Sequence, residues 1–451
     1  MIRRPPRSTL SSSSAASDVY KRQLIDYLLE NAEENDWQIT VGCRTLSTAE
    51  RVCKNHPRSR AISFDIENSE QAEEEIKNAN LVISMLPARF HPIPAKLCVK
   101  YGIHMVTTSY VSEELWKFDA EAKEKDILLL NEVGLDPGID HMSAMKIIER
   151  LKSEGANIVS FRSYTGGLVA PKYDNNPWNY KFTWNPRNVV LAGQGTAKYI
   201  VNGDYKYVPY HKLFQQVDKF NVLSYGEFEG YANRDSLQYR STYGLDNIPT
   251  MIRGTLRRTH YCKTYDVFIQ LGMTDDTYTI ENSENMTYRQ FINSFLQYDP
   301  EKTVEQKLSK YLNIPEDDYI MYRLRWLGIF DDQKIVGLPN ATPAQILQKI
   351  LEEKWSLDPE DRDLVVMQHI FEYITKSGVK KILKSSLAVE GDETKTAMAL
   401  TVGMPAALAV KLILQGKMKA NGVKIPTIPT IYDPILEELE KIGVIFIEEE
   451  E

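Results

Sequence analysis

The residues best suited to chemistry lie in LLLNEVGLDPGIDHMSAM, residues 128–145. The ten positions after Asn131 hold three carboxylates, two glycines, a proline and a histidine. Asp136 directly precedes Pro137 and Gly138, so a stiff backbone would hold its carboxylate in one direction. A carboxylate held in this way is suited to proton transfer. This junction is therefore the first candidate for a reactive site.

An apolar run ends before the junction, and a helical pattern, MSAMKIIERLKSEG, begins after it. This order is typical of the carboxyl end of a buried strand, where ligands bind in open α/β sheets. We expect Asp140 to be the N-cap of the helix, where the helix dipole favours a carboxylate. We expect His141 to be a packing residue at the helix start. For Asp136 we expect a role in the cleft, with a purely structural turn as the alternative.

The elements that must position this junction alternate between strand and helix, with short connections. Strands this apolar are typical of a parallel sheet that helices cover on both faces. The predicted strands are 37–43, 61–66, 81–87, 103–110 and 127–133, and the clearest predicted helices are 24–35, 48–56 and 69–79. The sequence therefore predicts an α/β protein with a doubly wound parallel sheet that binds a nucleotide.

The first strand and the glycine-rich loop of such a sheet are missing from this pattern. They would lie just before residue 24, where residues 1–22 form a basic, serine-rich stretch without an amphipathic face. We interpret residues 1–22 as a non-native segment. The later stretch VVLAGQGTAKYI, 189–200, has two of the three glycines of GxGxxG, and no alternating strands surround it. We interpret it as a chance match.

Arg44 indicates which nucleotide the sheet would bind. In such sheets the end of the second strand presents an acid to the ribose of NAD, or a nearby arginine accommodates the extra phosphate of NADP. The sequence VGCRT offers Arg44 beside Cys43 and Thr45. We therefore favour NADP, with a solvated loop arginine as the alternative. Asp65, at the end of the next strand, is expected either to contact the adenine or to cap a turn.

Composition argues against several other classes of protein. The 451 residues carry a formal charge of −8, which is no overall basic footprint for nucleic acid. The four cysteines form no CxxC pair and the seven histidines have no metal-ligand spacing, so we expect a reducing, cytoplasmic location and no metal. The apolar stretch 396–414 contains Gly403, Pro405 and Lys411, so we expect a buried helix and no membrane span.

Several longer motifs together resemble saccharopine dehydrogenase of the L-glutamate-forming type, also called saccharopine reductase. They are VTTSYVS (106–112), NEVGLDPGIDHM (131–142), GGLVAP (166–171), NNPWNYKFTWNPRNVVLA (175–192), YANRDS (231–236) and IRGTLR (252–257). The resemblance runs from about residue 24 to the C-terminus. It implies an NADP-dependent oxidoreductase of lysine metabolism that reduces the imine of aminoadipate semialdehyde and glutamate to saccharopine.

The resemblance also implies a substrate site. Saccharopine has several carboxylates, which arginines recognise with bidentate geometry. The implied substrate-binding residues are Ser109, Tyr110, Asp136, Arg234, Thr255, Leu256 and Arg257. Asp136 and Tyr110 are the expected catalytic pair, in which Asp136 orients the amine or exchanges a proton with it and Tyr110 supports Asp136 by hydrogen bonding. The alternative for each clustered arginine is a surface ion pair.

The same resemblance implies the residues that bind NADP. They are Cys43, Arg44, Thr45, Asp65, Ile66, Leu86, Ser109, Leu135, Asp136, Pro137 and Asn185. The chain departs from the family at Thr165, where many members have a cysteine. An essential thiol at this position is therefore not expected, and any role there would be hydrogen bonding.

The domain division implied by the family has three parts. A Rossmann-type NADP-binding domain covers 23–139 and is completed by 395–451. An α+β domain for substrate binding and dimerisation covers 140–290 and 360–394, and a small α-helical subdomain covers 291–359. A homodimer is the expected assembly, and small molecules are the only other expected partners.

Two other hypotheses remain open at this point. A related imine-reducing dehydrogenase would act on a polyamine-type conjugate, although a diamine substrate would favour acids over an arginine cluster. A non-catalytic relative or fragment would fit the missing glycine loop. Without the first strand, its neighbours would lose their ladder partner and leave buried backbone groups unsatisfied. We therefore expect this polypeptide to be unstable and to bind NADP weakly.

Overall fold

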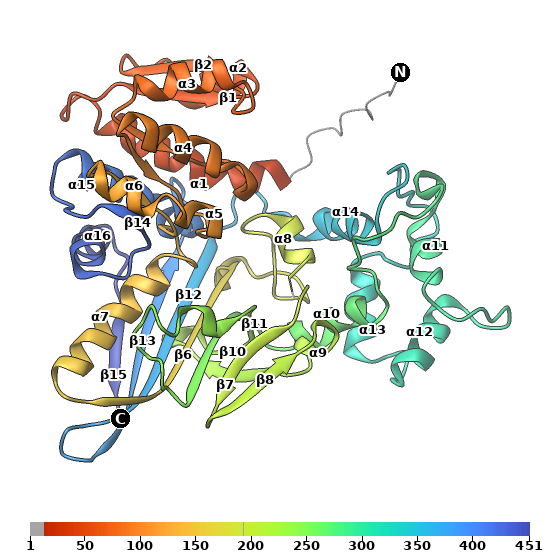
Figure 1. Ribbon diagram of the computed structural model, residues 1–451. Coiled ribbons are helices and arrows are strands. Elements are labelled where there is room, and N and C mark those ends of the chain that lie inside the picture. The colour runs from red at the N-terminus through yellow and green to blue at the C-terminus, as the bar shows by residue number, and fades with distance from the viewer. Residues whose placement is uncertain (1–12, 193) are drawn as a thin grey trace. The chain divides into compact units, whose positions relative to one another are not determined.

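The computed structural model describes residues 13–192 and 194–451 (Figure 1). The chain divides into two compact units. Of the described residues, the first unit contains 13–17, 160–240 and 247–370, and the second unit contains 18–159, 241–246 and 371–451. The domain division expected from the sequence stays a prediction.

A four-stranded parallel sheet lies in the second unit. Its strand order is β14–β5–β4–β3. The strands are β3 (Leu81–Ile83), β4 (His104–Val106), β5 (Leu128–Leu130) and β14 (Gly422–Lys424), and all three pairs are parallel. Every residue of β5 is buried, as expected for a strand covered on both faces. The predicted α/β class with a parallel sheet is confirmed.

A separate two-stranded parallel sheet consists of β1 (Ile39–Cys43) and β2 (Ser59–Ser63). Among the described residues, β1 pairs only with β2, and β3 pairs only with β4. In the common doubly wound order, the first strand would lie between β1 and β3. The described part of the chain therefore has the gap that the sequence pattern predicts.

Helices pack against both sheets of the second unit. They are α1 (Ser13–Glu30), α2 (Leu46–Cys53), α3 (Ser69–Lys77), α4 (Pro92–Tyr101), α5 (Glu113–Trp116), α6 (Asp119–Glu124), α7 (Ile139–Ser153), α15 (Met404–Leu414) and α16 (Pro429–Lys441). Cys98 and Val99 of α4 share one apolar cluster with Met105 of β4 and Leu129 of β5. Residues 13–22 of the segment interpreted as non-native form the start of α1, and residues 1–12 lie outside the described residues.

The first unit contains most of a large mixed sheet, in which five strands follow the order β12–β6–β11–β10–β9. These strands are β6 (Asn157–Val169), β9 (Asp218–Asn221), β10 (Glu227–Ala232), β11 (Thr250–Arg258) and β12 (Asp363–Ile374), and β7 (Ala197–Val201) pairs with β11 and with β8 (Asp204–Val208). β11 is parallel to β6 and antiparallel to β10. In the second unit, β13 (Lys380–Glu390) is antiparallel to β15 (Ile447–Glu450).

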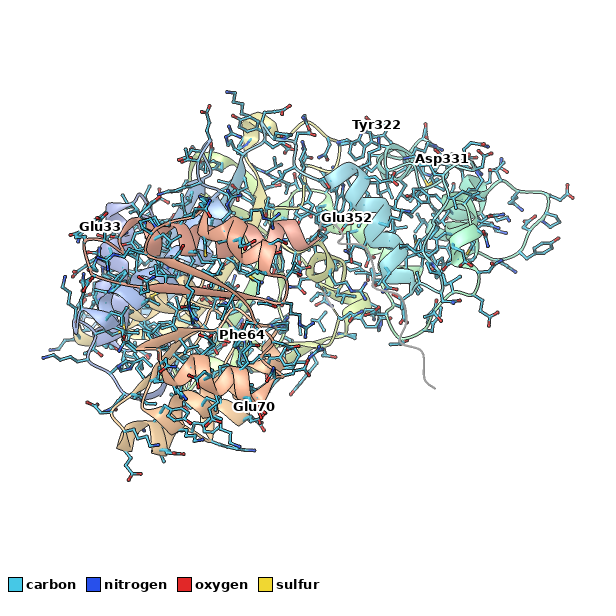
Figure 2. The ribbon with its side chains drawn as sticks, turned by 90° about the horizontal axis from the view of Figure 1, so that it is seen from above. Glu33, Phe64, Glu70, Tyr322, Asp331 and Glu352 are labelled. Atoms are coloured by element: carbon cyan, nitrogen blue, oxygen red, sulfur yellow. The ribbon has the colours of Figure 1, made fainter. Side chains whose placement is uncertain are left out.

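The stretch predicted to form an α-helical subdomain is helical in the structure. It contains α11 (Tyr288–Asn293), α12 (Val304–Leu312), α13 (Tyr319–Trp326) and α14 (Pro343–Trp355), and Figure 2 shows Glu352 on α14. Capping boxes start three of these helices, at Thr287, Thr303 and Thr342. In each box, a threonine hydroxyl accepts from a backbone N–H three residues later, and a glutamine there accepts in return.

The apolar stretch 396–414 forms a π-helical turn at Ala399–Gly403, followed by α15. Nine of the eleven residues of α15 are buried, as predicted. Across the described residues, no helix combines the length and the apolar character that a bilayer crossing requires.

Candidate active site

The corner between β5 and α7 closes on itself through backbone hydrogen bonds. The Gly134 N–H donates to the Pro137 carbonyl at 3.0 Å, and the Ile139 N–H donates to the Gly134 carbonyl at 2.9 Å. Gly138 has φ +150°, and a Cβ added there would lie 2.0 Å from the Gly134 oxygen. Only glycine fits this position. The corner therefore holds Asp136, which is half-buried between these bonds, on a backbone with little freedom.

Asp140 is not the N-cap of α7, and that expectation was wrong. Gly138 is the N-cap, and Asp140 is the second residue of the helix. Its Oδ1 accepts from the Gly138 N–H at 2.6 Å. The carboxylate thus satisfies a backbone donor of the helix start from inside the first turn, because the glycine at the cap has no side chain to do so.

A buried set of polar side chains lies beside the corner. His141 Nε2 is 2.9 Å from Glu132 Oε2, and His141 Nδ1 is 2.5 Å from the Tyr243 hydroxyl. Glu132, His141 and Tyr243 are each at most 1% exposed. We call them the Glu132–His141–Tyr243 network. The sequence analysis missed the network: His141 was expected only to pack, and Tyr243 comes from 102 positions away. The one signal available was a glutamate directly after an apolar strand.

The segment with Ser109 and Tyr110 follows β4. Hydrogen bonds join it to Glu132, which follows β5. The Glu132 N–H donates to the Ser109 carbonyl at 3.1 Å, and the Val111 N–H donates to Glu132 Oε1 at 2.9 Å. Ser109 and Tyr110 are both half-buried. The structure therefore brings the predicted residues Ser109 and Tyr110 to the same edge of the sheet as the Asp136 corner.

The residues predicted to bind the adenosine phosphate follow β1. Arg44 is exposed, and its guanidinium lies 3.4 Å from the exposed Glu67 carboxylate. Thr45 is the N-cap of α2, and its side chain makes no capping hydrogen bond. Cys43 is half-buried. An exposed guanidinium next to a hydroxyl that does not cap its helix fits the phosphate of an NADP ribose.

Asp65 and Ile66 follow β2 and differ in exposure. Asp65 is exposed, and its Oδ1 accepts from the Glu67 N–H at 3.1 Å, which is the turn-capping bond weighed in the sequence analysis. Ile66 is buried. Phe64, labelled in Figure 2, precedes them, and its N–H donates to the Cys43 carbonyl. The residues after β1 and β2 are therefore adjacent in the structure.

Leu86 is half-buried and follows β3, close in sequence to a buried serine–histidine pair. Ser84 Oγ and His91 Nδ1 are 2.7 Å apart, and both side chains are buried. His91 Nε2 is buried without a hydrogen-bond partner in the described part of the chain. Burial lowers the pKa of His91 to about 4, so the ring is neutral at neutral pH.

Arg257 lies in the first unit and is 2% exposed. Its guanidinium carbon lies 5.2 Å from the ring centre of Tyr180, 5.9 Å from that of Tyr231 and 5.5 Å from that of Tyr261. Nη1 donates to the Leu256 carbonyl, and Nε has no hydrogen-bond partner among the described residues. Burial raises the pKa of each of these tyrosines, so their hydroxyls stay protonated and supply no counter-charge.

The other predicted substrate residues of the first unit lie on β11, which carries Arg257, or directly after β10. Arg234 follows β10, is exposed and has φ +49°. On β11, Thr255 is half-buried and lies opposite Tyr231 of β10 and Thr165 of β6. Leu256 is fully buried, so it is a core residue on the strand that carries Arg257.

Asn185, the last predicted cofactor residue, is the N-cap of α8 (Pro186–Val190). Its side-chain oxygen accepts from the Arg187 N–H at 2.9 Å and from the Asn188 N–H at 3.4 Å. Asn185 belongs to the first unit, whereas Leu135, Pro137 and the other predicted cofactor residues belong to the second. Its amide oxygen already caps a helix.

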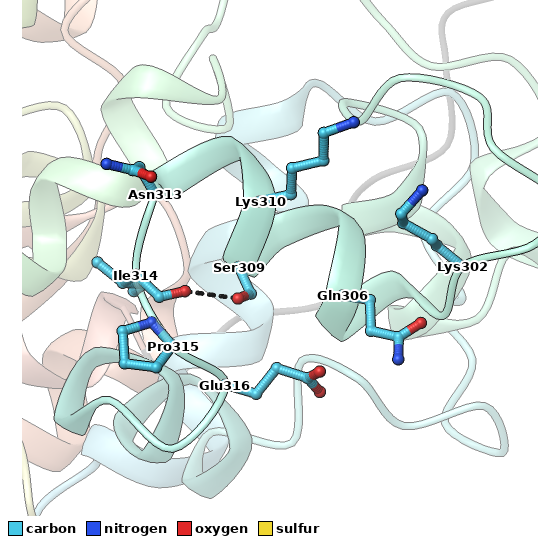
Figure 3. A pocket seen from close by; sticks show the side chains of 8 residues that line it. All are labelled: Lys302, Gln306, Ser309, Lys310, Asn313, Ile314, Pro315 and Glu316. Atoms are coloured by element: carbon cyan, nitrogen blue, oxygen red, sulfur yellow. Dashed lines mark hydrogen bonds between the residues drawn. The ribbon is translucent and has the colours of Figure 1, made fainter.

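Two surface hollows are found elsewhere. One of about 530 Å³ lies in the α-helical stretch and is lined by Lys302, Gln306, Ser309, Lys310, Asn313, Ile314, Pro315 and Glu316 (Figure 3). The other, of about 440 Å³, is lined by residues of α3, α4, β4 and α15 and of the loops beside them. Neither contains a predicted site residue. Within the described residues, no cluster of histidine, cysteine and acidic side chains could hold a metal ion.

Comparisons with known proteins match both halves of the chain. Residues 23–130 match the family model of the saccharopine dehydrogenase NADP binding domain, and residues 134–444 match that of the saccharopine dehydrogenase C-terminal domain. The family and the NADP cofactor expected from the sequence are therefore confirmed.

Curated relatives match the chain over nearly its full length. NADP(+), L-glutamate-forming saccharopine dehydrogenase of Pyricularia oryzae is 34% identical over 448 residues, which cover 97% of this chain and 98% of the relative. The protein of the same name from Schizosaccharomyces pombe is 32% identical and covers 94% of this chain and 95% of its own length. A solved apo structure of L-Glu-forming saccharopine dehydrogenase from Saccharomyces cerevisiae matches with a TM-score of 0.86 and 32% identity, over 96% of this chain and 98% of that one.

Proposed function

Because the chain belongs to the saccharopine dehydrogenase family, we propose that it is an NADP-dependent saccharopine dehydrogenase of the L-glutamate-forming type. It reduces the imine of aminoadipate semialdehyde and glutamate to saccharopine, in a reversible reaction of lysine metabolism. NADPH, when bound, supplies the hydride that the imine carbon accepts. The residues of this chain bind the carboxylates, orient the nitrogen and move its proton.

Arg257 supports this proposal through its burial and its unsatisfied Nε. A guanidinium that is 2% exposed, whose Nε has no hydrogen-bond partner among the described residues, is costly unless an anion completes its hydrogen bonds. A substrate carboxylate is such an anion. We propose that Arg257 and Arg234 bind carboxylates of saccharopine, and that Ser109, Thr255 and Leu256 also contribute to substrate binding.

We propose that Asp136 orients the bridging nitrogen and exchanges a proton with it. The iminium form of the substrate is cationic, so a carboxylate beside it also stabilises the charge. Tyr110 supports Asp136 by hydrogen bonding. The closed backbone of the corner supports this role, because a carboxylate must be held in one direction to act on one atom.

For the cofactor, we propose that Arg44 and Thr45 bind the ribose phosphate of NADP. Cys43, Asp65, Ile66 and Leu86 would line the adenosine side, and Leu135, Pro137 and Ser109 would lie toward the nicotinamide. We include Asn185 with less structural support than the others, since its amide oxygen caps α8.

The proposed function is tested by NADPH oxidation in the presence of glutamate and aminoadipate semialdehyde. The assay uses this chain and a second chain that carries an added first strand with a glycine-rich loop. Turnover in either chain, with saccharopine identified as the product, supports the proposal. If neither chain turns over and both are folded, the chain is a non-catalytic relative. Turnover only with a polyamine aldehyde conjugate would favour the second hypothesis.

We also propose a homodimer and a cytoplasmic location. In the described part of the chain, the cysteines at 43, 53, 98 and 262 form no disulfide, which suits a reducing compartment. Sedimentation of the purified protein over a range of concentrations tests the dimer, and a dimeric mass is expected. Imaging of the tagged chain tests the location.

A further inference from the structure

Glu132 has a backbone conformation that is uncommon for its residue type. Its φ is +60°, in the left-handed region that few residues other than glycine adopt. Such outliers persist only where the surrounding structure fixes them, and they gather at functional sites. Here the conformation accompanies a side chain that is 1% exposed and accepts on both carboxylate oxygens.

The hydrogen bonds of the network run in one direction. A carboxylate only accepts, so His141 Nε2 carries the hydrogen that it shares with Glu132. The Nδ1 atom of a neutral ring then accepts from the Tyr243 hydroxyl. The Asp140 carboxylate is 3.9 Å from Nδ1, which is beyond hydrogen-bond distance. In the tautomer with its hydrogen on Nε2, the chain of donors leads from Tyr243 through His141 to Glu132.

The other oxygen of Glu132 receives the Val111 N–H, and this bond extends the backbone contacts between two segments. Val133 N–H donates to the Thr107 carbonyl at 3.3 Å, and Glu132 N–H donates to the Ser109 carbonyl at 3.1 Å. The side-chain bond to Val111 is the third attachment along the same stretch. Ser109 and Tyr110 lie between the second attachment and the third.

We propose that His141 is a positioning residue, which through Glu132 holds the Ser109–Tyr110 segment in place for imine reduction. The inference rests on the proposed function for its catalytic consequence but not for its structural part. If His141 only filled space, any side chain of similar volume could replace it. If His141 is a positioning residue, its replacement must also provide a hydrogen-bond donor to Glu132 at the place of Nε2. Variants with and without such a donor distinguish the two roles.

The test compares two amide replacements of His141. His141→Gln places a nitrogen near the position of Nε2 and retains a donor to Glu132, whereas His141→Asn retains only an atom near Nδ1. Amide hydrogen exchange of the segment around Val111 reports the attachment without any turnover. The expected result is exchange at Val111 that is about tenfold or more faster in His141→Asn than in His141→Gln, and a kcat that is about tenfold lower, because small misplacements of reacting groups are costly.

The matched control is His104→Asn. His104 Nδ1 accepts from the Leu128 N–H at 2.9 Å in the same sheet but away from the corner, and asparagine retains that acceptor. Exchange at Val111 and kcat should both stay unchanged in this variant. A second pair, Glu132→Gln and Glu132→Leu, keeps the volume similar, and only the leucine variant should lose protection at Val111.

Equal exchange at Val111 in the two His141 variants, whether fast or slow, would overturn the proposal, and so would protection that survives in Glu132→Leu. An inactive wild-type chain with the expected exchange pattern would count against the proposed function alone. Normal turnover in every variant, despite the expected exchange pattern, would overturn the catalytic part of the inference.

Discussion

Two regions of the second unit differ in how firmly their predicted ligand-binding side chains are held. After β1 and β2, Arg44 and Asp65 are exposed, and the Arg44 guanidinium lies 3.4 Å from the solvent-exposed carboxylate of Glu67. After β5, Glu132 and His141 are buried, and Asp136 is held by closed backbone bonds. The side chains of the corner are fixed by internal hydrogen bonds, whereas Arg44 and Asp65 in the β1–β2 region face solvent.

This difference follows the chemistry expected of each region. Reacting groups gain most from fixed geometry, because misplacement lowers the rate steeply. A phosphate needs charge and donors near the surface, where small movements cost little. Among the described residues, β1 and β3 each have one edge without a partner strand, and buried backbone groups without partners weaken a sheet.

Replacing Asp136 should have the largest effect on turnover. Asp136→Asn removes the proton exchange and the negative charge but preserves the shape of the side chain. We expect kcat to fall about 100-fold or more, in the range that general acid–base groups contribute. The control from the other region is Asp65→Asn, which should change kcat by less than about threefold, because its carboxylate caps an exposed turn. Similar losses in the two variants would remove the distinction between the regions.

Adding a methyl group at the corner should cost more stability than adding one in the β1–β2 region. Gly138→Ala would place Cβ 2.0 Å from a backbone oxygen at φ +150°, and we expect a loss of about 3 kcal/mol or more. Gly42→Ala would place Cβ 2.9 Å from the Phe64 Cβ, so the neighbouring strand must shift slightly, and we expect a smaller loss of about 1–2 kcal/mol. Thermal unfolding checks both values. Equal losses would mean that the corner is no stiffer than the two-stranded sheet.

Completing the sheet should strengthen cofactor binding. A chain with an added strand between β1 and β3, followed by a glycine-rich loop, would pair the open edges and supply backbone donors for the pyrophosphate. We expect NADP affinity to rise about tenfold or more and the melting temperature to rise with it, because each buried backbone group that gains a partner is worth about 1 kcal/mol or more. Calorimetric titration measures the affinity. Tight NADP binding by the present chain would contradict the weak binding that we expect.

Removing the charge of Arg44 should change cofactor preference. Arg44→Gln loses a charge-assisted bond to the NADP phosphate, so the preference for NADPH over NADH should fall about tenfold, as one such bond is worth about 1.5 kcal/mol or more. Arg60→Gln is the control, because Arg60 lies on β2 and pairs with Glu75. A preference that is unchanged in Arg44→Gln would favour the solvated loop arginine.

The smallest effect concerns His91. Burial lowers its pKa from 6.5 to about 4, so between these values the unfolded chain binds a proton that the folded chain does not. The free energy of unfolding therefore falls as the pH falls from 6.5 to about 4. Above pH 6.5, His91 is neutral in both states and causes no such loss of stability. His91→Asn cannot titrate there, so its melting temperature should fall less over the same range. Parallel curves for the two proteins would show that His91 titrates normally in the folded state.

Much of the fold could be predicted from the sequence, because the signal is local. Apolar runs predicted β1 to β5, and α7 was predicted after the Asp136 corner with Asp140 as its N-cap, whereas it begins at Ile139. The error at Asp140 has a local cause as well: the chain uses Gly138 as the cap, and Asp140 reaches back to it from the first turn. A cap preference alone does not distinguish these two arrangements.

The network beside the corner could not be predicted, because its partners are distant in sequence. Nothing near Tyr243 indicates that six residues, 241–246, return to the second unit. The burial of Arg257 among three tyrosines likewise depends on strand register and on packing against α10 (Tyr261–Gln270). Residue types predicted the chemistry of the site, and tertiary contacts decide which side chains are held rigidly.

The most direct test of the account is a crystal structure of the protein with saccharopine and NADP bound. We predict an Asp136 carboxylate oxygen within about 3.5 Å of the bridging nitrogen, the outer limit for a hydrogen bond, and near the nicotinamide ring. An Asp136 carboxylate remote from both, with another acid or base at the nitrogen, would contradict the central claim.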